Sequence, residues 1–111
     1  MNPQTRELID RLRSGQDKQI RGVQHTCDGY CAEGLMSEIY RLHHPESCVW
    51  IHHGSAYRFN IDGEECSMHF LSRRVWEWFD LPPGGPSLLT MNDVAMLTFP
   101  QIADELEGSF R

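Results

Sequence analysis

Cysteine and histidine are the residues of this chain whose types and spacing could support chemistry. The sequence of 111 residues contains four cysteines and six histidines. Cys31 follows an Asp28-Gly29 turn signal and precedes apolar residues at helical spacing. The dipole of a helix lowers the pKa of a thiol at its N-terminus, and the thiolate is the reactive form. Cys31 is therefore a candidate nucleophile.

A histidine on a later strand would act as the base for such a thiol. His52 and His53 lie in a run of β-forming residues, and Asn60 or Asp62 follows as a third polar group. Neighbouring strand residues point to opposite faces, so only one of the two histidines can meet Cys31. The local signature of known cysteine hydrolases is missing around Cys31. A cysteine-dependent hydrolase is thus an alternative to a structural helix whose first core residue is Cys31.

The same residue types raise the question of a metal site. His25, Cys27 and Cys31 lie close together along the chain and could supply three zinc ligands. Structural zinc sites usually contain tight cysteine pairs, and no second pair is present. We expect buried cysteines, surface histidines and no cofactor, with a small zinc-stabilised domain as a further alternative. The residues that could complete a site are His43, His44, Cys48, His52, His53, Cys66 and His69.

Two tryptophans flank one glutamate in the segment 71–80. Side chains two positions apart on a helix diverge by about 200°. Trp76 and Trp78 therefore cannot both face one core, and an exposed tryptophan is a frequent anchor of protein interfaces. We predict a binding surface on this helix. Its residues are Trp76, Arg73, Arg74 and Glu77.

Length and charge limit the functions open to the chain. A chain of this length builds one modest core. The net charge of −6 repels phosphate, so we do not expect specific nucleic-acid binding. The segment 97–108 is similar to the first helix of a helix-turn-helix pair, but only Ser109, Phe110 and Arg111 follow it. No apolar run approaches the ~20 residues of a membrane span, and no signal-peptide core is present, so we expect a cytoplasmic protein with free thiols.

The elements that would position these residues follow from apolar spacing and end signals. In the segment 31–42 the apolar stripe consists of Leu35, Ile39 and Leu42. A further short helix is predicted over 87–97. The four main predicted helices cover 3–14, 31–42, 71–80 and 99–108.

The clearest strand signal is a hairpin over 48–61, in which two β-rich runs flank a Gly54-Ser55 turn. We therefore predict a single α+β domain over 1–111, with a small antiparallel sheet packed against about four helices. The other predicted elements are short strands at 18–24 and 65–69 and a Pro/Gly-rich loop at 81–86.

Four motif segments occur in one order along the chain: LRSGQDKQIRG (12–22), DGYCAEGLMSEIY (28–40), LSRRVWEWFDL (71–81) and LTMNDVAMLTFPQIADELEG (89–108). In these motifs the chain resembles, over most of its length, a group of small proteins encoded by bacteriophages and prophages. Members of that group often carry a second cysteine directly after Cys31, where this chain has Ala32. The resemblance implies phage origin and action in the cytoplasm of an infected bacterium, and it supplies no catalytic residues.

These observations favour a non-enzymatic phage or prophage accessory protein. We expect it to bind a host or phage protein and not a membrane, and the sequence leaves a homodimer open. That class rests on origin and fold and not on a recognised site. A buried Cys31 would favour this interpretation, and a solvent-accessible Cys31 would favour the hydrolase.

Overall fold

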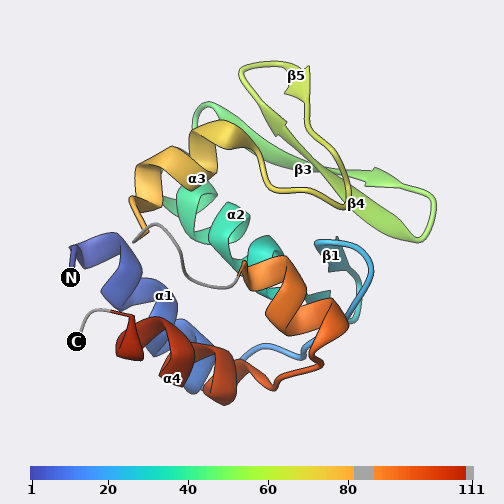
Figure 1. Cartoon of the computed structure of the whole chain (residues 1–111). Coiled ribbons are helices and arrows are strands. Elements are labelled where there is room, and N and C mark those ends of the chain that lie inside the picture. The colour runs from blue at the N-terminus through green and yellow to red at the C-terminus, as the bar shows by residue number, and fades with distance from the viewer. Residues whose placement is uncertain (82–86, 110–111) are drawn as a thin grey trace.

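Helices and a small antiparallel sheet form the two parts of the molecule, and the predicted α+β class is confirmed (Figure 1). The computed structural model describes residues 1–81 and 87–109. The elements are α1 Pro3–Arg13, β1 His25–Thr26, β2 Gly29–Tyr30, α2 Ala32–His43, β3 Cys48–His53, β4 Ala56–Ile61, β5 Glu64–Glu65, α3 Arg73–Phe79, the π-helical turn η1 Thr90–Val94 and α4 Phe99–Gly108.

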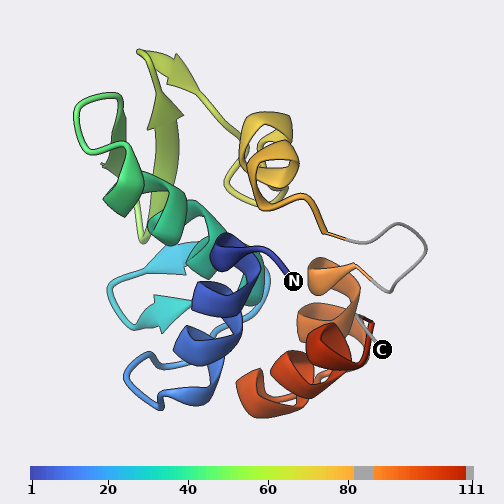
Figure 2. The same cartoon turned by 90° about the vertical axis from the view of Figure 1, so that its left-hand side faces the viewer.

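The central element is α2, which contacts α1, α3 and β2 (Figure 2). Its N-cap is Cys31, whose Sγ accepts a hydrogen bond from the Gly34 amide at 3.3 Å. Residues 32–40 are all buried, including the polar ones, because neighbours surround the helix. Leu42, expected in the buried stripe, lies beyond this stretch and is 50% exposed.

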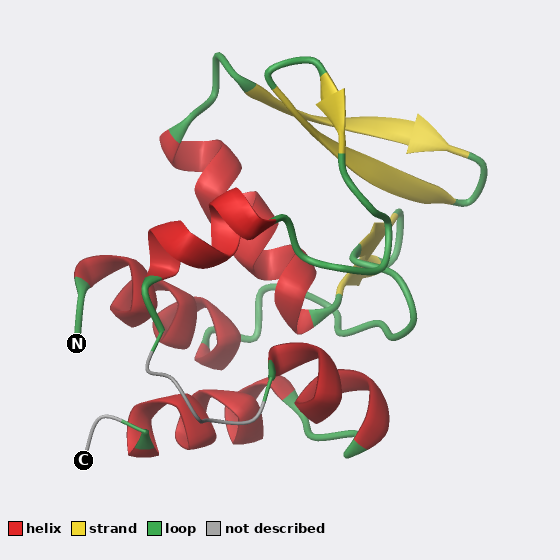
Figure 3. Ribbon diagram, turned by 45° about the horizontal axis from the view of Figure 1, so that its top comes forward, coloured by secondary structure: helices red, strands yellow, loops and turns green. Residues whose placement is uncertain are grey.

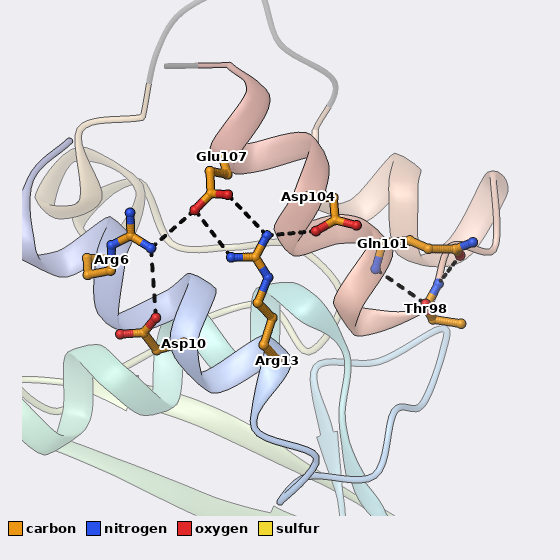
Figure 4. A network of polar contacts seen from close by, with 7 residues as sticks. All are labelled: Arg6, Asp10, Arg13, Thr98, Gln101, Asp104 and Glu107. Atoms are coloured by element: carbon orange, nitrogen blue, oxygen red, sulfur yellow. Dashed lines mark hydrogen bonds and ion pairs between the residues drawn. The ribbon is translucent and has the colours of Figure 1, made fainter. Parts of the chain in front are cut away.

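The N-terminal and C-terminal helices, α1 and α4, lie side by side (Figure 3). Their apolar residues meet in the core, and charged residues bridge the outer side (Figure 4). Arg13 Nη2 lies 2.6 Å from Asp104 Oδ1, and Arg6 Nη1 lies 3.2 Å from Glu107 Oε2. Exposed pairs of this kind contribute little to stability because water screens them, so apolar burial holds the two helices together.

A capping box begins α4 (Figure 4). The Thr98 hydroxyl accepts a hydrogen bond from the Gln101 amide, and the Gln101 side chain accepts one from the Thr98 amide. Pro100 occupies the first turn, where it costs no backbone hydrogen bond. These local signals explain why the sequence located this helix correctly.

The sheet has the strand order β2-β1-β4-β3, and β5 pairs with β4. The predicted hairpin is confirmed, since β3 and β4 pair from Cys48↔Ile61 to His53↔Ala56. Gly54 in its turn has φ 67°, a conformation that glycine adopts without steric cost. The predicted strand at 65–69 is wrong in extent, because the structure has only Glu64–Glu65.

The predicted strand at 18–24 is wrong, because only an isolated bridge joins Gln19 to Tyr30. The bridge consists of the hydrogen bonds from the Ile20 amide to the Tyr30 carbonyl and from the Tyr30 amide to the Lys18 carbonyl, and side chains also bind this segment. Asn92 Oδ1 accepts from Gln19 Nε2 at 2.8 Å, and Asn92 Nδ2 donates to the Ile20 carbonyl at 2.9 Å. Arg21 Nε donates to the Asn92 carbonyl. The Ile20 carbonyl, which is bonded to the Asn92 side chain, is therefore not available to a neighbouring strand.

Most of the predicted loop at 81–86 lies outside the described residues. The predicted helix over 87–97 is present in part, as η1. Within the described ranges, no helix has both the length and the apolar character needed to cross a bilayer.

Candidate functional site

A pocket of about 430 Å³ opens between the start of α2, α3 and the segment that leads into η1. Most of the residues that line it are apolar. Two of these residues are exposed at the surface: Phe70 is 63% exposed and Trp76 is 40% exposed. Large aromatic side chains at a pocket mouth are typical of binding sites. The lining residues are Glu33, Phe70, Leu71, Arg73, Trp76, Ser87 and Leu89.

The polar group of this pocket is the carboxyl of Glu33, which is only 7% exposed. Its Oε1 has no hydrogen-bond partner among residues 1–81 and 87–109. Burial raises the pKa of Glu33 to about 7; the Leu71 backbone amide opposes this rise, and the charge of Asp93 adds to it. A buried carboxyl without full compensation is costly to the fold, and such groups concentrate at functional sites.

A second buried glutamate of α2 shows what a fully compensated carboxylate looks like. Glu38 accepts hydrogen bonds from Arg41 at 2.6 and 2.8 Å, and from the Trp50 indole at 3.0 Å. Burial alone would raise the pKa of Glu38, but these hydrogen bonds outweigh it and lower the pKa. Glu38 is therefore structural, whereas Glu33 is left without such partners.

The four residues predicted to bind a partner divide into two groups. Arg73 and Trp76 line the pocket, and Glu77 lies beside it because its carboxylate binds Arg73 Nε at 2.8 Å. Arg74 is engaged elsewhere, with Asp62 at 2.9 Å. Trp78 packs edge-on against Tyr40 and Phe79, so the two tryptophans do face different surroundings.

The backbone that presents Phe70 is held firmly. Gln24 Nε2 donates to the Phe70 carbonyl at 2.8 Å, and the Gln24 amide donates to the Met68 carbonyl at 2.9 Å. The Gln24 side chain is fixed in turn by the Ser37 hydroxyl at 2.7 Å. The backbone that carries the exposed phenyl ring is therefore already ordered, so binding a partner there would cost little conformational entropy.

The thiol of Cys31 has properties opposite to those of a nucleophile. Cys31 is 2% exposed, and burial raises its pKa to about 12 despite the hydrogen bond from Gly34. His52 and His53 are exposed at the far end of β3, and no hydrogen bond joins either of them to Cys31 in the described part of the chain. The thiol stays protonated at neutral pH, so the hydrolase alternative gains no support.

The candidate zinc ligands are not gathered. Within residues 1–81 and 87–109, no group of three or more His, Cys, Asp or Glu side chains is placed to hold a metal ion. Cys27 is exposed and Cys31 is buried. The His25 ring stacks between Tyr30 and Tyr57, at centroid distances of 4.0 and 4.5 Å.

Sequence reasoning missed Glu33 and the aromatic Phe70. An acidic residue in the first turn of a helix is ordinary, because it complements the helix dipole, so Glu33 carried no signal of its own. Phe70 lies in the loop between β5 and α3 and has no periodic pattern around it. Glu33 lies in the stretch 32–40 of α2, where polar and apolar residues alike are buried, but that burial depends on tertiary neighbours and has no signal in the sequence.

No protein-family model, curated protein or solved structure matches the chain. The fold and the pocket therefore define the protein as a small α+β domain with an exposed aromatic site, and its function is argued from that site alone.

We predict that Glu33→Gln stabilises the protein at neutral and higher pH. The pKa of the Glu33 carboxyl is about 7 in the folded protein and 4.5 ordinarily. Below the ordinary value the carboxyl is protonated in both the folded and the unfolded state, so its burial adds no charge-related cost to folding. Stability then falls as pH rises between these values and stays low above them. The glutamine variant should gain about 2 kcal/mol at pH ~8 and little at pH ~4. Urea unfolding at both pH values measures this; an equal gain by the exposed Glu105→Gln would contradict it.

Proposed function

We propose that the protein is a non-enzymatic module that binds another protein through the surface around Trp76. The observation that carries this proposal is the exposure of Phe70 and Trp76 at the mouth of one pocket. Burying two such rings against a partner would remove a large apolar area from water. Aromatic residues next to a pocket are also the usual hot spots of interfaces.

The chemistry of the chain supports binding over catalysis. The candidate thiol is buried and protonated, and the charge that acts on the Glu33 carboxyl is the like charge of Asp93. The net charge of −6 favours a basic protein surface over a nucleic acid as the partner. The resemblance to small phage and prophage proteins makes a bacterial host protein or a phage protein the proposed partner class, and the bacterial cytoplasm the proposed location.

The experiment is capture of partners from lysates of infected and uninfected bacteria on immobilised protein. Trp76→Ala and Phe70→Ala should each reduce capture by at least about tenfold. Ile51→Ala is the matched control, because Ile51 is 44% exposed but lies on β3, outside the pocket. Circular dichroism checks that each variant is folded. Equal capture by wild type, Trp76→Ala and Ile51→Ala would reject this surface.

A further inference from the structure

The feature that the binding proposal does not use is the unpartnered oxygen of Glu33. Glu33 is in contact with the pocket, yet its Oε1 lies buried with no donor supplied by residues 1–81 or 87–109. A buried acceptor without a donor destabilises the fold, and a charged one does so more strongly. The terminal torsion of a glutamate is broad, so the carboxyl can rotate to meet a donor that enters the pocket. The site is therefore built to receive a hydrogen-bond donor.

The charges around Glu33 favour a positive donor. Asp93, at η1, adds negative charge, and the neighbouring Cys31 thiol is neutral. Arg73 of α3 lines the pocket, but its side chain is 89% exposed and its guanidinium is paired with Glu77. Arg73 therefore leaves the charge of Glu33 uncompensated when that carboxyl ionises.

The walls favour a cation carried on a long apolar stem. Leu71 and Leu89 provide aliphatic surface, and Phe70 and Trp76 provide aromatic rings. A guanidinium is planar and weakly hydrated, stacks on tryptophan and donates several hydrogen bonds to a carboxylate. An ammonium group is more strongly hydrated and therefore loses more hydration free energy on entering an apolar pocket.

We infer that the pocket receives an arginine side chain of the partner protein, with Glu33 accepting hydrogen bonds from the guanidinium and Trp76 stacking on it. This inference rests on the proposed function and names the residue type that the partner must present. It also explains why an acidic side chain is tolerated at the base of an apolar pocket, because its compensation arrives with the ligand.

Binding should depend on pH. The ionised form of Glu33 binds the cation, so the affinity should rise as pH increases through the pKa of about 7. The other titratable or charged groups near Glu33 are Asp93, Arg73 and Cys31, and the Cys31 thiol stays protonated over this range.

The test is NMR titration of the full chain with n-butylguanidinium, n-butylammonium and neutral n-butylurea at pH ~8 and pH ~6. The guanidinium should shift the Leu71 amide and the Trp76 indole saturably. It should bind at least about tenfold more tightly than butylurea, and more tightly at the higher pH. Glu33→Gln should remove this preference, whereas the exposed Glu105→Gln should keep it.

Absent binding, equal affinity for butylguanidinium and butylurea, or tighter binding of butylammonium would overturn the arginine assignment. The capture assay separates this inference from the function. Capture that Trp76→Ala abolishes but Glu33→Gln leaves intact would reject the arginine site and keep the binding module. If the protein binds butylguanidinium saturably but captures no partner protein, the protein-binding function is rejected and the guanidinium site is retained.

Discussion

Replacing Gly34 by alanine is expected to destabilise the protein by about 4 kcal/mol or more. In an isolated helix the same change would stabilise, because alanine has the higher helix propensity. Here a Cβ would overlap the carbonyl oxygen of Gln24, which is backbone and cannot rotate away. The start of α2 would have to move, breaking the 3.0 Å hydrogen bond from the Cys31 amide to the Gln24 carbonyl.

The matched control for this prediction is Gly108→Ala. Gly108 is the last residue of α4, and a Cβ there meets nothing within 4 Å. This variant should be neutral or stabilised by up to about 1 kcal/mol. Urea unfolding followed by tryptophan fluorescence compares the two. If Gly34→Ala unfolds at the same urea concentration as Gly108→Ala, the close approach of α2 to Gln24 is not a constraint.

The second large effect is expected for Asn92→Ala, at about 3–5 kcal/mol of lost stability. Asn92 is fully buried, and its side chain joins three segments that are distant in sequence. It accepts hydrogen bonds from the Ala32 amide at 3.2 Å and from Gln19, and it donates to the Ile20 carbonyl. Alanine would leave the buried Ala32 amide without an acceptor and would remove the part-buried hydrogen bond to the Ile20 carbonyl. Gln19, in contrast, would keep its bond to the Leu97 carbonyl. The lost hydrogen bonds and the cavity left by the deleted side chain together give the expected loss of stability.

A suitable control is Asn60→Ala in β4. Asn60 is also buried, at 7% exposure, but its side chain forms no hydrogen bond to another residue in the described part of the chain. Thermal unfolding at one protein concentration should show a clearly larger drop for Asn92→Ala than for Asn60→Ala. Similar drops would mean that burial of the asparagine, and not its hydrogen bonds, determines stability.

The binding residues show where sequence reasoning succeeded and where it failed. Helical geometry alone separated Trp76 from Trp78, because the angle between side chains two positions apart does not depend on the rest of the fold. Geometry does not say which of the two is exposed; the prediction chose Trp76, and the structure puts this residue and Arg73 at the pocket. Helical geometry could not foresee that Arg74 would pair with Asp62, a residue in a turn beyond β4.

Cys31 illustrates the same division. The sequence placed it at a helix start, and that position is confirmed, since Cys31 is the N-cap of α2. Whether a thiol there is reactive depends on its solvation, which neighbouring segments control. Those neighbours bury the sulfur and raise its pKa to about 12. A local motif therefore could not distinguish a nucleophile from a core residue.

The sequence by itself determined the α+β class, the helix positions and the β3–β4 hairpin, because caps, turns and apolar periodicity act over a few residues. Only the tertiary structure decided that α2 lies at the centre, that 18–24 is held by Asn92 and by one bridge to Tyr30 instead of a regular strand ladder, and that Glu33 is buried at a pocket. Each of these depends on contacts between residues far apart in the chain. Burial and hydrogen-bond partners at such distances have no local signal, so the candidate site became visible only once the elements were packed together.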